Sequence, residues 1–354
     1  MTQLLVGSKK GLFVLDGEPG SAFRVAARRF EGDVVEYAIR DPRTGRYFAG
    51  VTSGFYGPRV MYTDDPLGDW HASAGPAFPS DGDTAVERIW RIEPGESDGL
   101  LYAGVAPAAL FSSSDGGESW VLNDALWKER SAGEWQPGAG GLALHSICTW
   151  PGDPARLAVG ISAAGVWITE DAGESWHTGY RGLHPAYLPE DLRENTNALC
   201  VHNMSRAARR PERLFLQFHG SVYRSDDEGA SWTDIAAGLP SGFGFPIAID
   251  PADPDSAFVV PLASDGDRVL PDGRGRVFET RDAGSSWAPR TDGLPQSDAY
   301  LTVLRQAFGV SGEGAALQLY FGATSGEVFG SADAGASWFQ VAQRLAPVTS
   351  VRVA

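Results

Sequence analysis

Short apolar stretches alternate along the whole chain with polar segments rich in Gly, Asp, Ser and Pro. Near the N-terminus they come in close pairs: Leu4–Gly7 with Gly11–Leu15, then Tyr47–Val51 with Arg59–Tyr62. Short runs of β-branched and aromatic residues bounded by turn-forming residues are typical of β-strands joined by tight turns. The pattern therefore predicts an all-β protein, with helix limited to a turn or two around Pro189–Arg193.

One polar segment recurs as a motif, Ser/Thr-x-Asp-x-Gly-x-Ser-Trp. Its five copies are Ser113–Trp120, Thr169–Trp176, Ser225–Trp232, Thr280–Trp287 and Ser331–Trp338, and their tryptophans are 56, 56, 55 and 51 residues apart. A long motif at a near-constant period indicates one supersecondary unit repeated and stacked along the chain.

The residue types of the motif predict a tight turn. The aspartates accept hydrogen bonds from turn N–H groups, the glycine supplies a positive φ, and the tryptophan packs between neighbouring units. Because every repeat carries a copy, the aspartates are interpreted as structural: Asp115, Asp171, Asp227, Asp282 and Asp333.

These copies resemble the Asp-box (BNR) repeats of the sialidase-like β-propeller superfamily, which also includes sortilin-like domains and photosystem-assembly factors. The resemblance covers nearly the whole chain and implies a ring of four-stranded antiparallel blades. It implies no single activity, because that superfamily contains both glycosidases and proteins that only bind.

Counting the repeats predicts seven blades in one domain, residues 1–354. A degenerate box at Thr63–Trp70 precedes the five complete ones, and the first strand pair of the chain, Leu4–Gly7 with Gly11–Leu15, has no box. Six segments read as innermost strands: Val34–Arg40, Ala85–Ile92, Leu142–Trp150, Asn197–Met204, Gly244–Ile249 and Ala299–Gln306. The seventh is expected from the C-terminus: residues 349–353 would lie beside Leu4–Gly7, complete blade 1 with residues 4–30, and close the ring.

The net charge and the amino-acid composition exclude some kinds of binding partner. The net charge of −16 argues against nucleic acid or an acidic lipid surface as a ligand. The absence of a long apolar run and of a signal peptide predicts a cytoplasmic protein without a membrane partner. The only cysteines, Cys148 and Cys200, are expected to be buried free thiols, and no zinc-type spacing occurs.

Aligning the inner strands places ionisable residues at one shared position in four successive blades: Glu36, Arg88, His145 and His202, followed by Phe245. Such residues are costly to bury unless they are paired, hydrated or used. The alignment predicts a polar pocket at the channel mouth.

The predicted catalytic residues have distinct roles. Glu36 and Glu87 are the acid/base candidates, Arg88 is an anion clamp, and the histidines, His145, His202 and His219, are bases, donors or metal ligands. A divalent metal is the only cofactor that these residues suggest. The alternative is a water-filled channel with a merely polar lining.

Long loops and the residues beside this column provide the predicted ligand-binding residues. They are Tyr37, Tyr56, Arg59, Trp127, Trp135, Gln136, His184, Tyr187, Asn203 and Gln217. Loop aromatics are suited to stacking on a sugar ring, although they can also form a lid that packs on itself.

Two functions remain open from sequence. One is a hydrolase or lyase acting on a small polar or carbohydrate-like substrate at the channel mouth; the other is a scaffold that docks a protein partner on its loop face. Exo-sialidase activity is not supported, because the Arg-Ile-Pro signature is missing and an arginine triad cannot be aligned.

Overall fold

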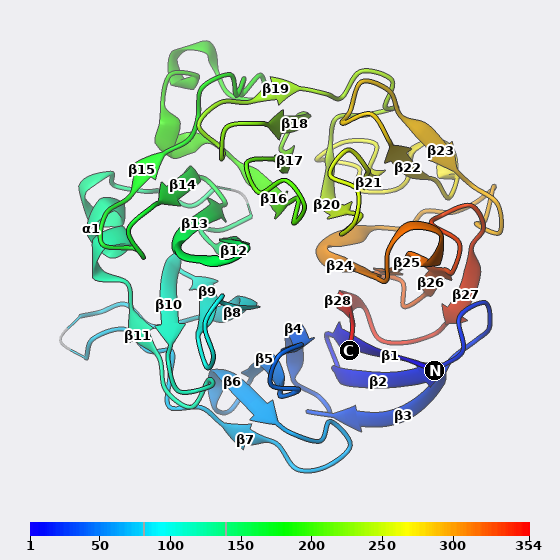
Figure 1. Cartoon of the computed structure of the whole chain (residues 1–354), viewed down its shortest axis with the longest axis horizontal. Helices are drawn as coiled ribbons and strands as arrows, with labels where there is room; N and C mark the ends of the chain where they lie inside the picture. Colours follow the sequence, from blue (N-terminus) through cyan, green and yellow to red (C-terminus); the bar gives the residue numbers. More distant parts are fainter. Residues whose placement is uncertain (81, 139) are drawn as a thin grey trace.

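The computed structural model describes residues 1–80, 82–138 and 140–354. Sheets of mainly antiparallel strands stand radially around a common axis, and in each four-stranded sheet the first strand lies nearest the axis (Figure 1). This all-β arrangement agrees with the strand pattern of the sequence.

Five of the sheets have four strands each. They are β4 (Val34–Arg40), β5 (Tyr47–Ser53), β6 (Gly57–Thr63) and β7 (His71–Ala72); β8 (Arg88–Pro94), β9 (Leu101–Ala106), β10 (Ala109–Ser113) and β11 (Val121–Leu122); β12 (Leu144–Trp150), β13 (Asp153–Ile161), β14 (Gly165–Thr169) and β15 (His177–Thr178); β16 (Val201–Arg206), β17 (Leu214–Phe218), β18 (Val222–Ser225) and β19 (Thr233–Asp234); and β20 (Gly244–Ile249), β21 (Ala257–Pro261), β22 (Val277–Thr280) and β23 (Ala288–Arg290).

The remaining sheet joins the two ends of the chain. Its strands, in spatial order, are β27 (Phe339–Ala342), β26 (Val328–Ser331), β25 (Gln318–Ala323), β24 (Val303–Ser311), β28 (Val348–Val353), β1 (Thr2–Ser8), β2 (Gly11–Gly17) and β3 (Arg24–Arg29). Strand β28 pairs antiparallel with β1, from Leu4–Val353 to Gly7–Ser350, and meets β24 through one parallel bridge, Gln306–Ser350.

Helical residues are more numerous than the sequence predicted. The 3₁₀ turn η1 (Glu190–Leu192) lies where a turn was expected, but the loop after β11 forms an α-helix, α1 (Asp124–Ala132). Asn123 caps this helix by accepting a hydrogen bond from the Leu126 backbone N–H, and the Leu126 side chain is the buried one of the helix. The other 3₁₀ turns are η2 (Thr196–Ala198), η3 (Pro271–Gly273) and η4 (Gly314–Ala316). None of the helices in the described ranges is both long and apolar enough to span a bilayer.

The repeated motif forms the turn between the third and fourth strands of its sheet. In the second copy, Asp171 accepts hydrogen bonds from the Ser175 backbone N–H (2.9 Å) and hydroxyl (2.6 Å), and Gly173 has φ +88°. In three copies the tryptophan indole N–H then donates to the segment that follows the preceding sheet, as Trp232 does to the Gly179 carbonyl (3.2 Å). These motifs therefore shape their own turns and tie neighbouring sheets together.

Candidate functional site at the mouth of the channel

The inner strands carry a β-bulge near their first residues. In β4, β8, β12 and β16 the pairing with the second strand skips one residue, respectively Glu36, Trp90, His145 and His202. In β20 the irregularity spans Phe245 and Pro246. A bulge turns the side chain of the extra residue out of the regular alternation and is common beside functional sites. These bulges therefore set which side chains surround the axis.

The prediction that Arg88 shares the position of Glu36 is wrong, because the bulged residue of β8 is Trp90. Trp90 precedes Leu100, the first residue of the next segment, by the same interval as Glu36 precedes Arg46. Arg88 instead pairs with Ala106 at the strand end and is 53% exposed. It stays beside the site, since its Nε lies 3.7 Å from Glu36 Oε1.

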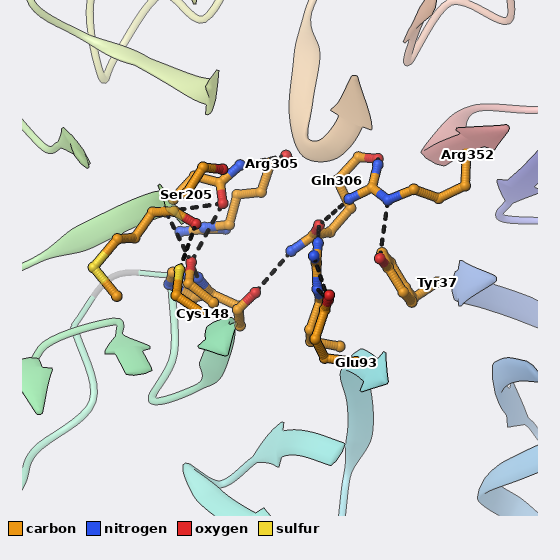
Figure 2. A network of polar contacts seen from close by, with 12 residues as sticks. Tyr37, Glu93, Cys148, Ser205, Arg305, Gln306 and Arg352 are labelled. Carbon is orange, nitrogen blue, oxygen red and sulfur yellow. Dashed lines mark hydrogen bonds and ion pairs between the residues drawn. The ribbon is translucent and has the colours of Figure 1, made fainter. Parts of the chain in front are cut away.

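Strand β24 sends a segment across the axis. Its pairing with β25 is interrupted between Val303 and Phe308. Within the gap, the Arg305 carbonyl accepts a hydrogen bond from Asn203 Nδ2 (2.8 Å), and Gln306 Nε2 donates to the His145 carbonyl (2.8 Å), so the segment bonds to two sheets on the far side (Figure 2).

The Gln306 side chain connects further walls. Its Oε1 accepts hydrogen bonds from Arg91 Nη1 (2.8 Å) and Arg352 Nη2 (2.7 Å), and Arg352 Nε donates to the Tyr37 hydroxyl (2.9 Å) (Figure 2). Arg91 also pairs with Glu93. We call this hydrogen-bonded layer the crossbar; it lies between the two mouths of the channel.

On the face where the inner strands begin, two cavities meet. One, of about 500 Å³, is lined by Glu87, Arg88, Trp90 and Gln136 among others. The second, of about 610 Å³, is lined by Tyr187, Cys200, His219, Asp265 and Gln136 among others. Gln136 and Pro137 belong to both walls, so the two cavities are neighbours; together they are here named the loop-face mouth.

Arg305 contributes a cation to this region. Its guanidinium carbon lies 5.1 Å from the Phe245 ring centroid and 5.6 Å from that of Trp90. Burial lowers the pKa of Arg305 to about 10, so it remains charged at neutral pH. Among the described residues its Nε has no hydrogen-bond acceptor and no carboxylate offsets its charge. Arg305 is half-buried, and a cation removed in part from water without a counter-charge is costly.

His145 is fully buried and engaged on both sides. Its Nδ1 lies 3.1 Å from the Ser146 hydroxyl and its Nε2 lies 3.0 Å from the Val201 carbonyl. Burial, with a contribution from the Arg305 charge, holds its pKa well below the usual range. The structure therefore gives His145 no free nitrogen for a metal, contrary to the sequence prediction, and its contacts are those of a structural residue.

His202 and His219 lie together, with ring centroids 5.1 Å apart. Nδ1 of the buried His202 is 2.6 Å from the Gly244 carbonyl. Burial lowers the pKa of both rings, that of His202 to well below its ordinary value, while Asp265 at 3.7 Å opposes the shift at His219. Both histidines are consequently neutral at pH 7.

Glu36 is a buried carboxylate behind the cavity wall, next to Arg88. Only 9% of its side chain is exposed, and burial raises its pKa despite the opposing charges of Arg88 and Lys9. A carboxyl group with a raised pKa is suited to donating a proton. Glu87, the second acid/base candidate, is exposed in the cavity wall.

The predicted loop residues divide by exposure. Tyr56 is 74% exposed, with the Arg59 guanidinium 4.6 Å from its ring centroid, and Gln136 and His184 are also exposed. Tyr187 is half-buried and stacks on His219, with ring centroids 4.3 Å apart.

Trp135 is not the exposed loop aromatic that the sequence suggested, because it is 5% exposed and packs on Trp167, with ring centroids 5.1 Å apart. It does contribute to the wall of the 500 Å³ cavity. Trp127, on α1, packs on Phe78 at 4.6 Å and is half-buried. For these two tryptophans the alternative interpretation, a lid that packs on itself, describes the structure.

Three more predicted ligand residues are engaged elsewhere. Tyr37 and Asn203 line a separate cavity of about 580 Å³ at the opposite mouth, together with Arg91 and Arg352. Both come one residue after a bulge and belong to the crossbar, on the side that faces this opposite mouth. Gln217 is buried, and its Nε2 donates to backbone carbonyls, including that of Gly242 (2.8 Å). The side-chain amide of Gln217 therefore serves as a hydrogen-bond donor to backbone carbonyls.

Sequence reasoning gave no place in the mouth to Arg305, Trp90, Asp265 or Cys200. An arginine within a predicted inner strand was a usable signal for Arg305, as was the Cys-Val-His order for Cys200 beside His202. Asp265 had no such signal, because its loop meets His219 only in the folded chain.

No family model and no curated protein matches the sequence. Solved structures do match. An ancestral GH74 enzyme has a TM-score of 0.58 at 15% identity over 99% of this chain, and this chain spans 40% of that one. Apo AztD from Citrobacter koseri has a TM-score of 0.55 at 11% identity, covering 100% of this chain and 98% of that one. YCF48 bound to D1 peptide has a TM-score of 0.54 at 12% identity, covering 92% and 85%.

One of these neighbours is an enzyme and another is a protein bound to a peptide, so structural similarity to them indicates no particular activity. At such low identity it concerns the fold alone. With the radial antiparallel sheets of Figure 1, the likeness shows that the chain is a β-propeller.

Proposed function

We propose that the protein is a seven-bladed Asp-box propeller of the sialidase-like kind that binds a small anionic, carbohydrate-like molecule in the loop-face mouth and acts on it as a hydrolase or lyase. The observation that carries the proposal is the half-buried guanidinium of Arg305, whose Nε has no acceptor and which lacks a counter-charge among the described residues.

The blade count rests on how the eight-stranded sheet is divided. Strands β24 and β28 meet through a single bridge, whereas β28 and β1 pair along five residues. Dividing the sheet at that bridge gives a blade of β24–β27 and a blade of β28, β1, β2 and β3. With the five four-stranded sheets these make seven, and the β28–β1 pairing closes the ring.

An anion is the ligand that best offsets the charge of Arg305. Arg305 and Arg268 both contribute positive charge near His202, and Arg88 lies in the cavity wall. The Trp90 ring in the same wall offers an apolar face to a sugar. A carboxylate or phosphate on a sugar ring would meet both features.

The chemistry proposed for the bound molecule is acid catalysis by Glu36. Burial favours its protonated form, and Arg88 beside it stabilises the carboxylate that remains after proton transfer. The exposed Glu87 is the candidate base on the cavity wall. This division of roles suits hydrolysis or elimination at a glycosidic oxygen.

Binding is tested by calorimetric titration of the full chain with glucuronate, N-acetylneuraminate and glucose 6-phosphate, with glucose as the uncharged probe. We expect at least one anion to bind and Arg305→Met to abolish its binding. Arg209→Met, at an exposed arginine far from the mouth, is the matched control. Binding of glucose alone, or unchanged binding by Arg305→Met, overturns the anion site.

Catalysis is tested separately with glycosides of the acid that binds. Glu36→Gln should retain binding and lose about 10²-fold or more of the turnover. A Glu36→Gln protein with wild-type turnover would leave a binding protein without acid catalysis at this position.

A second function, docking of a protein partner, is favoured by one observation. The β5–β6 hairpin tip exposes Phe55 (96%) and Tyr56 (74%) on the face that carries the mouth. Exposed adjacent aromatics at a loop tip are typical of contact residues. A Phe55→Ser/Tyr56→Ser variant that loses peptide or protein capture but keeps anion binding would favour the scaffold; the reverse result favours the enzyme.

A further inference from the structure

We propose that Cys200, His202 and His219 form a zinc site in the loop-face mouth, with the fourth coordination position facing the 610 Å³ cavity. The proposal goes beyond the anion site, because it concerns different donor atoms and can fail independently.

The three side chains already converge. One donor atom from each, a Cys sulfur and two imidazole nitrogens, lies within 4.8 Å of the other two. In tetrahedral zinc with bonds of about 2.0–2.3 Å the donor atoms are about 3.3–3.8 Å apart. Shifts of about an ångström, within the reach of side-chain rotation, would complete the triangle.

The fold explains why they meet. Cys200 directly precedes β16 and His219 directly follows β17, and these strands pair through Val201 and Phe218. The backbone N–H of His219 donates to the backbone carbonyl of Cys200 (3.1 Å), which fixes the two residues side by side. The bulge at His202 turns its ring toward His219, so the start of β16 and the end of β17 together supply the three donors.

The hydrogen bond of His202 suits a metal. Because the Gly244 carbonyl accepts from Nδ1 of His202 (2.6 Å), Nε2 carries the lone pair, which is the arrangement typical of a histidine ligand and its outer partner.

The fourth position has two candidate occupants. Asp265 Oδ2 lies 3.7 Å from Nε2 of His219, on a loop that is 65% exposed at this residue, and the cavity leaves room for water or substrate. A site with three protein ligands and an accessible position has the ligand count of catalytic zinc centres. The thiolate and imidazole donors favour Zn²⁺ over Ca²⁺ or Mg²⁺.

Cobalt titration of the chelator-treated full chain tests the site. We expect one Co²⁺ per chain, a near-ultraviolet thiolate-to-cobalt charge-transfer band, intense visible bands of four-coordinate Co²⁺, and loss of all of them when Zn²⁺ is added. Cys200→Ser should abolish the charge-transfer band, and His219→Gln should weaken Zn²⁺ binding by roughly tenfold or more.

Two controls keep the result interpretable. His177→Gln, at an exposed histidine on β15, should bind cobalt like the wild type, and Arg305→Met should keep the band, which separates this site from the anion site. Absence of the band in the folded wild type, or its persistence in Cys200→Ser, overturns the proposal. If Cys200→Ser does not fold, the His219→Gln titration decides: unchanged zinc affinity refutes the site.

Discussion

The Gln306 side-chain amide donates to the backbone carbonyl of His145, 161 residues away, at 2.8 Å. This bond joins β24 to a strand on the other side of the axis, and the same side chain accepts from Arg91 and Arg352. The interior of the ring is therefore held by a polar layer in addition to the apolar contacts between blades.

Replacing Gln306 with Leu should destabilise the fold by about 2–4 kcal/mol, because the guanidinium groups and the carbonyl lose buried partners together. Denaturant unfolding measures the loss. The exposed Gln340→Leu change on β27 should alter stability by no more than about 0.5 kcal/mol. A loss below about 1 kcal/mol in Gln306→Leu would contradict the role of the crossbar.

Glu36 should make stability depend on pH in a defined direction. Burial raises its pKa above the ordinary 4.5, so the folded state prefers the protonated carboxyl. That preference stabilises the fold fully below about pH 4.5 and is lost as the pH rises through the folded value. Glu36→Gln should therefore be more stable than the wild type at pH 8, with the difference vanishing toward pH 4.

The measurement is the free energy of unfolding of both proteins between pH 4 and 8. The exposed Glu87→Gln serves as the matched control, with the same change of charge and no burial. A pH-independent difference for Glu36→Gln would contradict the assignment.

Removing residues 349–354 should prevent cooperative folding or lower the melting temperature severely. The deletion takes β28 from between β1 and β24 and leaves two unpaired edges, which invite aggregation. Thermal unfolding and size-exclusion chromatography measure the effect, with deletion of Ala354 alone as the control. A truncated protein that melts like the wild type would show that the terminal strand is dispensable.

Substitution by alanine should lower the stability of the fold strongly at Trp135 and hardly at all at Tyr56. Trp135→Ala removes a buried ring packed on Trp167 and should cost about 3–5 kcal/mol. Tyr56→Ala, at an exposed tip, should change stability by no more than about 0.5 kcal/mol. Equal effects of the two changes on unfolding would contradict this assignment of buried and exposed aromatics.

Local chemistry is what the sequence alone determined. The boxes with Asp171 and Gly173 predict their turns, since a turn depends on a few adjacent residues, and apolar runs such as Val34–Arg40 predict the inner strands. The alignment of those strands likewise singled out Glu36 and His202, which the structure places at the bulges of β4 and β16.

Tertiary structure decided what those residues face. A bulge moves one side chain by one position without any consistent signature in sequence, which is why Trp90 takes the place expected for Arg88. The meeting of Cys200, His202 and His219 and the counter-charge missing from Arg305 depend on contacts between separate strands and blades. Such contacts follow from how the whole ring packs, because burial and charge pairing are properties of the assembled fold and not of any one segment.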